Sequence, residues 1–289
     1  MKKSAAVSNA SASGTFLLDG HLSIHRLGFG AMRLTGPGIW GPPENPKESK
    51  AVLRRAIELG VNFIDTADSY GPDVSENLIA ETLYPYPSDL VIATKGGYMR
   101  TGPDQWVMNG HPEYLKKCLE GSLKRLRLNR IDLYQLHRID PAVPVEESLG
   151  VLKKMQEQGK IRYIGLSEVS VAEIERARKT VEIISVQNLY NMGNRKWESV
   201  IQYCEKHHLA FIPWFPLESG DLLKKKGVLE SLAKRKGATP AQIAIAWLLK
   251  HSKVIVPIPG TSSVEHLEEN MAAASVQLSE SELSELESV

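Results

Sequence analysis

The chain has few cysteines, no long hydrophobic run and almost no net charge. Its 289 residues contain only two cysteines, Cys118 and Cys204, which provide neither a disulfide framework nor the spacing of metal ligands. No stretch approaches the roughly 18 consecutive apolar residues that a membrane span needs. The 35 basic side chains nearly balance the 34 acidic ones, which argues against a protein that coats nucleic acid or an anionic membrane. These absences predict a cytoplasmic protein without nucleic-acid or membrane partners and without a metal centre.

The composition is that of an ordinary globular chain, with 42% hydrophobic and 24% charged residues. Residues 1–14 are rich in Ala, Ser and Asn and lack the apolar run of a secretory leader, so we predict a disordered N-terminal tail. Residues 15–289 are then expected to form one domain. At its start, Thr15–Leu18 and Leu22–His25 flank an Asp-Gly pair, which is typical of a β-hairpin.

Helical and strand patterns alternate along the rest of the chain. In the first such unit Asn45 is a candidate helix cap, Gly60 is a candidate helix end, and the strand pattern Val61–Asp65 follows at once. Eight runs have the length of a strand: Leu27–Gly30, Asn62–Asp65, Leu90–Lys95, Ile131–His137, Ile161–Ser167, Ile183–Asn188, Ala210–Trp214 and Val254–Ile258. Eight units of about 34 residues predict an α/β fold, a single (β/α)8 TIM barrel whose floor is capped by the hairpin. A doubly wound open sheet is the alternative.

Polar or aromatic side chains stand at the ends of most of these strand patterns. They are Asp65, Lys95, His137, Ser167, Gln187 and Trp214. A parallel barrel gathers the carboxyl ends of its strands at one mouth, so these side chains are expected to lie together. Strands between a helix layer and a barrel interior are otherwise apolar to their ends, so packing alone explains this pattern poorly.

Asp65, Lys95, His137 and the loop residue Tyr70 together suit the reduction of a carbonyl group. A carbonyl that accepts hydride needs a proton on its oxygen, and a tyrosine supplies one when a nearby ammonium lowers its pKa from about 10. Lys95 is the candidate ammonium, Asp65 is the carboxylate that keeps it charged, and His137 is a hydrogen-bonding partner of the same oxygen. The same four residues also suit an aldolase in which Lys95 forms a Schiff base.

Seven segments between Leu22 and the C-terminus form a family pattern. They read GVNFIDTADSYG, VIATKGG, DLYQLHRID, KIRYIGLSEVS, SVQNLYN, FIPWFPLESGDL and VPIPGTSSVEHLEENM. Together they resemble the aldo-keto reductase family, which implies a (β/α)8 barrel that reduces aldehydes or ketones with NADPH. The resemblance makes Asp65, Tyr70, Lys95 and His137 the catalytic tetrad. It also implies a set of cofactor-binding residues, namely Gly30, Met32, Ser167, Gln187, Trp214, Leu217, Ser219, Asp221, Gly260, Thr261, Ser262, Ser263, His266, Glu269 and Asn270.

The resemblance gives these cofactor residues distinct roles. It implies that Trp214 stacks on the nicotinamide ring, while Ser167 and Gln187 hold the carboxamide. Residues 217–221 wrap the pyrophosphate, and residues 260–270 surround the adenosine half.

Two features depart from the family pattern. Glu168 stands where many members have Asn, which affects how the carboxamide is held. Gly260 and His266 stand where Lys or Arg often meets the ribose 2′-phosphate. NADPH is still expected, with NADH as an alternative, because the hydroxyls of residues 261–263 lie at a predicted helix start that can bind phosphate.

Further phrases indicate a substrate. GAMRLTGPGIWGPP, YGPDVSEN and IPWFPL are similar to the pyridoxal reductase-like branch of the family, which implies that pyridoxal is reduced to pyridoxine. Trp40 and Trp214 are expected against the substrate ring, and Arg138 at its phenolate oxygen. A broad aldehyde or ketone reductase is one alternative, and a non-catalytic NADPH-binding regulatory subunit is another. Beyond a small carbonyl compound, the sequence identifies no partner.

Overall fold

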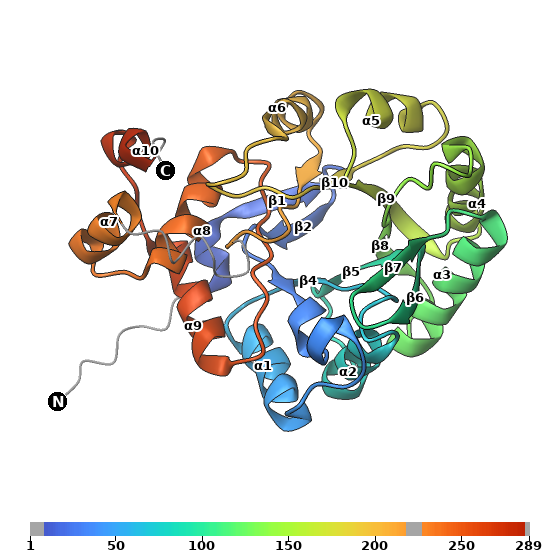
Figure 1. Ribbon diagram of the computed structural model, residues 1–289, viewed down its shortest axis with the longest axis horizontal. Coiled ribbons are helices and arrows are strands. Elements are labelled where there is room, and N and C mark those ends of the chain that lie inside the picture. Colours follow the sequence, from blue (N-terminus) through green and yellow to red (C-terminus); the bar gives the residue numbers. More distant parts are fainter. Residues whose placement is uncertain (1–8, 218–226, 287–289) are drawn as a thin grey trace.

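Parallel strands surrounded by helices form the body of the protein (Figure 1). The computed structural model describes residues 9–217 and 227–286. Seven strands follow the order β11-β10-β9-β8-β5-β4-β3, and all neighbours are parallel. They are β3 (Phe29–Gly30), β4 (Phe63–Asp65), β5 (Val91–Gly96), β8 (Ile131–Leu136), β9 (Ile161–Ser167), β10 (Ser185–Gln187) and β11 (Ala210–Phe211).

The predicted eighth strand, residues 254–258, closes the sheet into a barrel. The amide of Phe211 donates to the carbonyl of Val254 at 2.9 Å, and the amide of Val256 donates to the carbonyl of Phe211 at 2.8 Å. On the other side, the amide of Gly28 donates to the carbonyl of Pro257 at 3.0 Å. The segment therefore lies between β11 and β3 although it pairs through single residues. This closure confirms the (β/α)8 barrel and makes the open-sheet alternative wrong.

Ten α-helices are described, and most of them follow a strand. They are α1 (Pro46–Glu58), α2 (Val74–Leu83), α3 (Pro112–Leu126), α4 (Val145–Glu157), α5 (Val171–Arg178), α6 (Glu198–His207), α7 (Val228–Lys236), α8 (Pro240–His251), α9 (Val264–Ala272) and α10 (Glu280–Leu286). Local signals fix several of their boundaries. Asn45 caps α1 by accepting a hydrogen bond from the amide of Glu48, and Gly60 follows that helix with a φ of +76°. Ser170 and Thr239 begin α5 and α8 with capping boxes.

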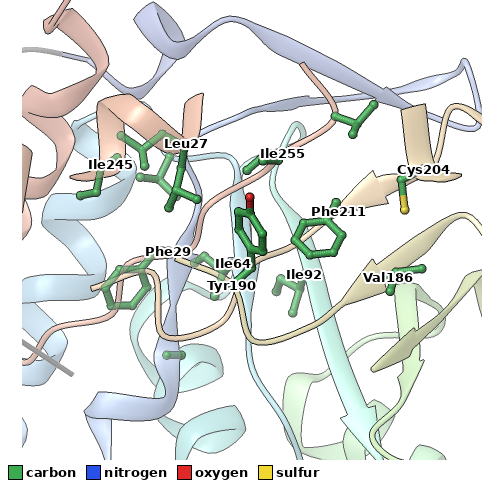
Figure 2. Close-up of a cluster of buried hydrophobic side chains, with 14 of the residues drawn as sticks. Leu27, Phe29, Ile64, Ile92, Val186, Tyr190, Cys204, Phe211, Ile245 and Ile255 are labelled. Atoms are coloured by element: carbon green, nitrogen blue, oxygen red, sulfur yellow. The ribbon is translucent and has the colours of Figure 1, made fainter. Parts of the chain in front are cut away.

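The two faces of each strand build two layers of core. Residues that point into the barrel include Phe63, Val91 and Leu133, whereas Ile64 and Ile92 point outward to the helices. The outer layer is shown in Figure 2, where aliphatic side chains surround the rings of Tyr190 and Phe211. This alternation follows from the two-residue period of a strand.

The N-terminal hairpin forms the barrel floor, as predicted. Its strands are β1 (Thr15–Leu18) and β2 (Leu22–His25), which are joined by three residues rather than two. Leu18 and Ile24 are fully buried and belong to the cluster inside the barrel. The floor is therefore held by apolar packing under the strands.

The residues before the hairpin correct one prediction. Residues 1–8 lie outside the described part, but the 3₁₀ helix η1 (Ala10–Ser13) is ordered and its Ala10 is buried. The amide of Ala10 donates to the carbonyl of Leu59 at 2.7 Å. A disordered tail extending to residue 14 is therefore wrong for residues 9–14, because they pack against the end of α1.

A second hairpin, which was not predicted, lies between β5 and α3. Its strands are β6 (Tyr98–Gly102) and β7 (Gln105–Met108). Three further 3₁₀ helices complete the described elements: η2 (Ala31–Leu34), η3 (Pro37–Ile39) and η6 (Ala273–Ser275). Among the helices of residues 9–217 and 227–286, none is long and apolar enough to span a membrane.

Candidate active site

Strand periodicity carries three polar side chains into the mouth of the barrel. On β5, Val91 and Ala93 point into the barrel, so Lys95 points the same way two residues later. By the same rule Asp65 follows Phe63 on β4, and Gln135 follows Leu133 on β8. The sequence placed Asp65 and Lys95 here correctly but missed Gln135.

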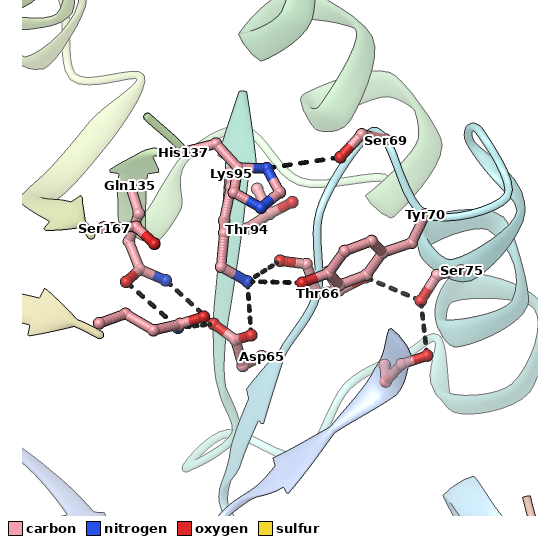
Figure 3. A network of polar contacts seen from close by, with 12 residues as sticks. Asp65, Thr66, Ser69, Tyr70, Ser75, Thr94, Lys95, Gln135, His137 and Ser167 are labelled. Atoms are coloured by element: carbon pink, nitrogen blue, oxygen red, sulfur yellow. Dashed lines mark hydrogen bonds and ion pairs between the residues drawn. The ribbon is translucent and has the colours of Figure 1, made fainter. Parts of the chain in front are cut away.

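A buried ion pair lies at the centre of the site (Figure 3). The Nζ of Lys95 donates to Asp65 Oδ1 at 2.5 Å, to the carbonyl of Thr66 at 2.9 Å and to the hydroxyl of Tyr70 at 3.4 Å. These three acceptors match the three protons of an ammonium group. Burial alone lowers the pKa of Lys95, but the carboxylate of Asp65, with the hydrogen bonds to Asp65 and Tyr70, outweighs this effect and the pKa is raised. Lys95 is therefore a stable cation although none of its surface is exposed.

The hydroxyl of Tyr70 is held by Lys95 but is not acidified as the sequence suggested. Burial raises its pKa above the ordinary 10, and the nearby ammonium of Lys95 offsets this only in part. The predicted net lowering is wrong because the ring is almost completely enclosed, with 6% of its surface exposed. Tyr70 is therefore a protonated donor at neutral pH.

His137 lies beside Tyr70 as a neutral ring. Its Nδ1 is 3.4 Å from the hydroxyl of Ser69, and its centroid is 6.0 Å from the Tyr70 ring. Burial lowers the pKa of His137 well below 6.5, and the cations Lys95 and Arg138 lower it further. The imidazole is thus uncharged at pH 7, so it can offer one N–H donor to a bound substrate.

The second oxygen of Asp65 is fixed by two amides. Oδ2 accepts hydrogen bonds from Gln135 Nε2 and from Gln187 Nε2, both at 2.9 Å. Gln187 was expected at the nicotinamide carboxamide; it lines the cavity, and its amide also supports the ion pair. These two hydrogen bonds hold the carboxylate so that its other oxygen, Oδ1, faces Lys95.

These residues open onto a cavity of about 830 Å³. Asp65, Tyr70 and His137 of the tetrad line it, whereas Lys95 lies buried behind Tyr70. Most of the predicted cofactor residues also line it, namely Gly30, Met32, Ser167, Gln187, Trp214, Leu217, Gly260, Thr261, Ser262, His266, Glu269 and Asn270. For the other three predicted cofactor residues, the cavity lining gives no support. Ser263 instead caps α9, and Ser219 and Asp221 lie outside the described residues.

The start of α9 is partly satisfied within the chain. Glu48 Oε1 accepts from the amide of Val264 at 3.1 Å, and the hydroxyl of Ser263 accepts from the amide of His266 at 3.4 Å. Arg33, which sequence reasoning did not assign to the site, lines the same cavity and lies close to Gly260. Its position directly after Met32 was the available signal. Arg33 and His266 therefore bring basic groups to this part of the cavity.

The predicted substrate residues are only partly found at the cavity. Arg138 lines it, and its Nη1 donates to the carbonyl of His137 and to the hydroxyl of Ser167. Trp40 is not among the lining residues. Instead Tyr98 and Trp106 of the second hairpin line the cavity and pack edge to face, with ring centroids 5.4 Å apart. The aromatic wall therefore comes from β6 and β7 and not from the first loop.

Arg100 connects this hairpin to the loops around it. Its guanidinium donates to the carbonyls of Gly38, Ile39 and Ser69 at 2.8–2.9 Å, and to Gln105 within the hairpin at 2.9 Å. It also stacks over the ring of Trp106. Ser69 directly precedes Tyr70, so Arg100 links the aromatic wall to the loop that carries Tyr70.

Comparison with known proteins identifies the family. The sequence model of the Aldo/keto reductase family matches residues 26–289. The chain belongs to the aldo-keto reductase family. As a member it is an NAD(P)H-dependent oxidoreductase.

Individual relatives cover nearly the whole chain. An uncharacterized oxidoreductase of Schizosaccharomyces pombe is 50% identical over 281 residues, which are 96% of this chain and 91% of the relative. The pyridoxine 4-dehydrogenase of Escherichia coli is 44% identical over 284 residues, which are 96% and 99% of the two chains. Among solved structures, the glycerol dehydrogenase of Gluconobacter oxydans superposes with a TM-score of 0.87 at 25% identity, covering 96% of this chain and 95% of that one.

Proposed function

We propose that this aldo-keto reductase uses NADPH to reduce an aromatic aldehyde of the pyridoxal type to its alcohol. The observation that carries the proposal is the Tyr70 hydroxyl, which is held by a buried ammonium and faces a cavity with an aromatic wall. Bound NADPH supplies the hydride to the carbonyl carbon. The rest of the reaction depends on the side chains of this chain.

Tyr70 supplies the proton that the carbonyl oxygen takes up. As the proton leaves, negative charge develops on the phenol oxygen, 3.4 Å from the Lys95 ammonium. This charge is stabilised by a cation whose own position is fixed by Asp65. The neutral ring of His137 orients the substrate oxygen with a hydrogen bond. The product is an alcohol, and Tyr70 regains its proton from water.

The cavity suits a dinucleotide that carries a 2′-phosphate. Its lining joins the catalytic residues to the segment of residues 258–270. Thr261 and Ser262 offer hydroxyl and backbone donors, and the basic groups of Arg33 and His266 line the same region. These groups favour NADPH over NADH, which lacks the additional phosphate.

Two observations favour pyridoxal among aldehydes. One is the 44% identity to a pyridoxine 4-dehydrogenase, an enzyme whose name describes the reverse oxidation. The other is the pairing of an aromatic wall with a cation, because Tyr98 and Trp106 offer ring faces and edges while Arg138 lies in the same cavity. Pyridoxal carries an aromatic ring and a phenolate oxygen, which match these two features.

The geometry does not favour an aldolase. A Schiff base requires an uncharged lysine amine, whereas all three protons of the Lys95 ammonium have acceptors and its pKa is raised. Lys95 also lies behind Tyr70 and is not among the residues that line the cavity.

The test is NADPH oxidation with pyridoxal, pyridine-4-carbaldehyde and butanal under matched conditions. We expect kcat/KM for pyridoxal to exceed that for butanal by at least about tenfold. Pyridine-4-carbaldehyde lacks the phenolate, so the Arg138→Ala variant should lower kcat/KM for pyridoxal more than for this control. If pyridoxal is no better than butanal, the substrate proposal fails and a broad aldehyde reductase remains. If the chain binds NADPH but reduces none of the panel, the reductase proposal itself fails.

A further inference from the structure

Glu168 directly follows β9, at a position where a side-chain amide was expected from the family pattern. Its backbone has a φ of +55°, a left-handed conformation that is uncommon for a residue other than Gly, Asn or Asp. Such a conformation persists only where the surroundings hold it. The hydrogen bonds of the Glu168 side chain indicate why this backbone conformation is maintained.

The carboxylate of Glu168 connects three neighbouring strand ends. Its Oε1 accepts from the indole Nε1 of Trp214 at 2.7 Å and from the amide of Leu189 at 2.5 Å. Leu189 follows β10, and Trp214 follows β11. The backbone repeats the connection, since the amide of Glu168 donates to Gln187 and the amide of Trp214 donates to Asn188.

The hydrogen bond to Glu168 determines how the Trp214 ring is turned. An indole has a single N–H donor, so anchoring it restrains the orientation of the ring. The other ring contacts are less directional: Phe215 lies edge-on at 4.7 Å between centroids, and the Arg138 guanidinium lies 5.9 Å from the ring centre. Trp214 lines the cavity, whereas Glu168 is not among the lining residues.

We propose that Glu168 is a positioning residue, which holds the Trp214 indole as the platform for the nicotinamide ring and makes no contact with the cofactor itself. The inference rests on the NADPH binding proposed above. A glutamate suits this position because one oxygen of its side chain accepts both hydrogen bonds, from Trp214 and from Leu189. This role explains why Glu168 departs from the family pattern. The residue at this position holds the Trp214 ring beneath the nicotinamide instead of the nicotinamide carboxamide.

The first experiment measures the hydrogen bond without any cofactor. The indole ¹H–¹⁵N signals of the isotope-labelled full chain are recorded, and the signal lost in Trp214→Phe identifies residue 214. We expect this signal to be shifted downfield and to move upfield in Glu168→Ala. In Glu168→Gln it should keep most of its shift, because the amide oxygen can still accept. A Trp214 signal that does not change in Glu168→Ala would show that the carboxylate does not hold the ring.

The second experiment separates the two halves of the cofactor by calorimetry. The ligands are NADPH and 2′-phospho-ADP-ribose, which lacks the nicotinamide. We expect Glu168→Ala to weaken NADPH binding by about fivefold to tenfold, the loss of roughly one hydrogen bond, and to leave 2′-phospho-ADP-ribose within about twofold. Glu168→Gln should restore NADPH binding. Equal weakening of both ligands would indicate a general structural role and overturn the proposal.

A double-mutant cycle gives the decisive control. In the Trp214→Phe background, which has no indole N–H, Glu168→Ala should change NADPH binding by less than about twofold. An undiminished effect in that background would mean that Glu168 acts on the cofactor by another route. Trp214→Phe alone also removes the bond while leaving the contact between Glu168 and Leu189 intact, so the test stands if Glu168→Ala does not fold. Absence of NADPH binding by the unaltered chain would instead refute the proposed function.

Discussion

The guanidinium carbon of Arg100 lies 3.6 Å from the centre of the Trp106 ring, close enough for the two planes to stack. Arg100 thereby supports the cavity wall from behind while its N–H groups hold the carbonyls of Gly38, Ile39 and Ser69. One side chain thus maintains the distance between the aromatic wall and the loop that carries Tyr70.

Replacing Arg100 with lysine should loosen this wall. Lysine keeps the charge but lacks the planar fork that reaches several carbonyls at once. We expect KM for an aromatic aldehyde to rise by about tenfold, with the dissociation constant of NADPH unchanged within about twofold. Steady-state kinetics and calorimetry provide both values. Arg162→Lys is the matched control, because Arg162 lies 5.1 Å over the ring of Tyr163 and is not among the cavity residues. Equal effects of the two variants would argue against a specific role.

Removing the Tyr70 hydroxyl should abolish proton donation without disturbing the cavity. Tyr70→Phe keeps the ring, so we expect the reduction rate to fall on the order of a thousandfold while NADPH binding is nearly preserved. Lys95→Met should act similarly because the developing phenolate loses its cation. Asp65→Asn should be milder, since the lysine remains. A Tyr70→Phe enzyme that retains most of its single-turnover rate would eliminate Tyr70 as the acid.

The pH dependence of reduction should be flat near neutrality. Burial raises the pKa of Tyr70 above 10, so the acid stays protonated, and burial lowers the pKa of His137 well below 6.5, so the imidazole stays neutral. We expect kcat/KM for benzaldehyde, which does not itself titrate, to change by less than about threefold between pH 6 and 9. A tenfold fall with a midpoint between pH 7 and 8 would contradict one of these two protonation states.

Asp68 should make the fold less stable as the pH rises. Burial, with a smaller contribution from the charge of Glu76, raises its pKa to about 7, and its Oδ1 has no hydrogen-bond partner among the described residues. In the unfolded chain the pKa is about 3.9, so between pH 4 and 7 the folded state retains a proton that the unfolded state has released. Stability from this group is therefore present at low pH, declines through that window and is level above it.

The variant Asp68→Asn removes this titration. Between pH 5 and 8 the unaltered chain should lose about 3 kcal/mol more unfolding free energy than the variant, as measured by urea denaturation at each pH. Asp89→Asn, at an exposed position, is the control and should follow the unaltered chain. Parallel curves for the Asp68→Asn variant and the unaltered chain would place the Asp68 carboxyl near its ordinary pKa.

The barrel and the convergence of Asp65 and Lys95 at its mouth could be predicted because they follow from local, periodic signals. A strand places alternate residues on one face, so the polar residue that ends an apolar run marks the mouth of a parallel barrel. Asp65 and Lys95 needed no long-range information beyond this. The net shift of the Tyr70 pKa could not be predicted, because it depends on how completely distant segments enclose the ring.

The second hairpin shows a different limit of sequence reasoning. The Pro-Asp pair between Tyr98–Gly102 and Gln105–Met108, preceded by Gly102, is a local signal from which this hairpin could be predicted. The presence of Trp106 at the cavity, in place of Trp40, does not follow from local sequence, however. Trp106 packs on Arg100, whose guanidinium donates to carbonyls more than 30 residues away. Likewise, the bond between Glu168 and Trp214 joins residues 46 apart in sequence.

The closure of the barrel has a consequence for how the protein is made. A Cβ on Gly30 would lie 2.7 Å from the carbonyl oxygen of Ile258, and one on Gly260 would lie 2.5 Å from that of Gly30, so the two ends of the barrel meet backbone to backbone. Residues of both ends line the cavity of about 830 Å³ described above. A nascent chain on the ribosome therefore does not have the whole lining of this cavity until α9 has emerged. Cofactor binding is then a late event in biogenesis. A ligand that contacts both ends of the barrel also stabilises the closed barrel by mass action.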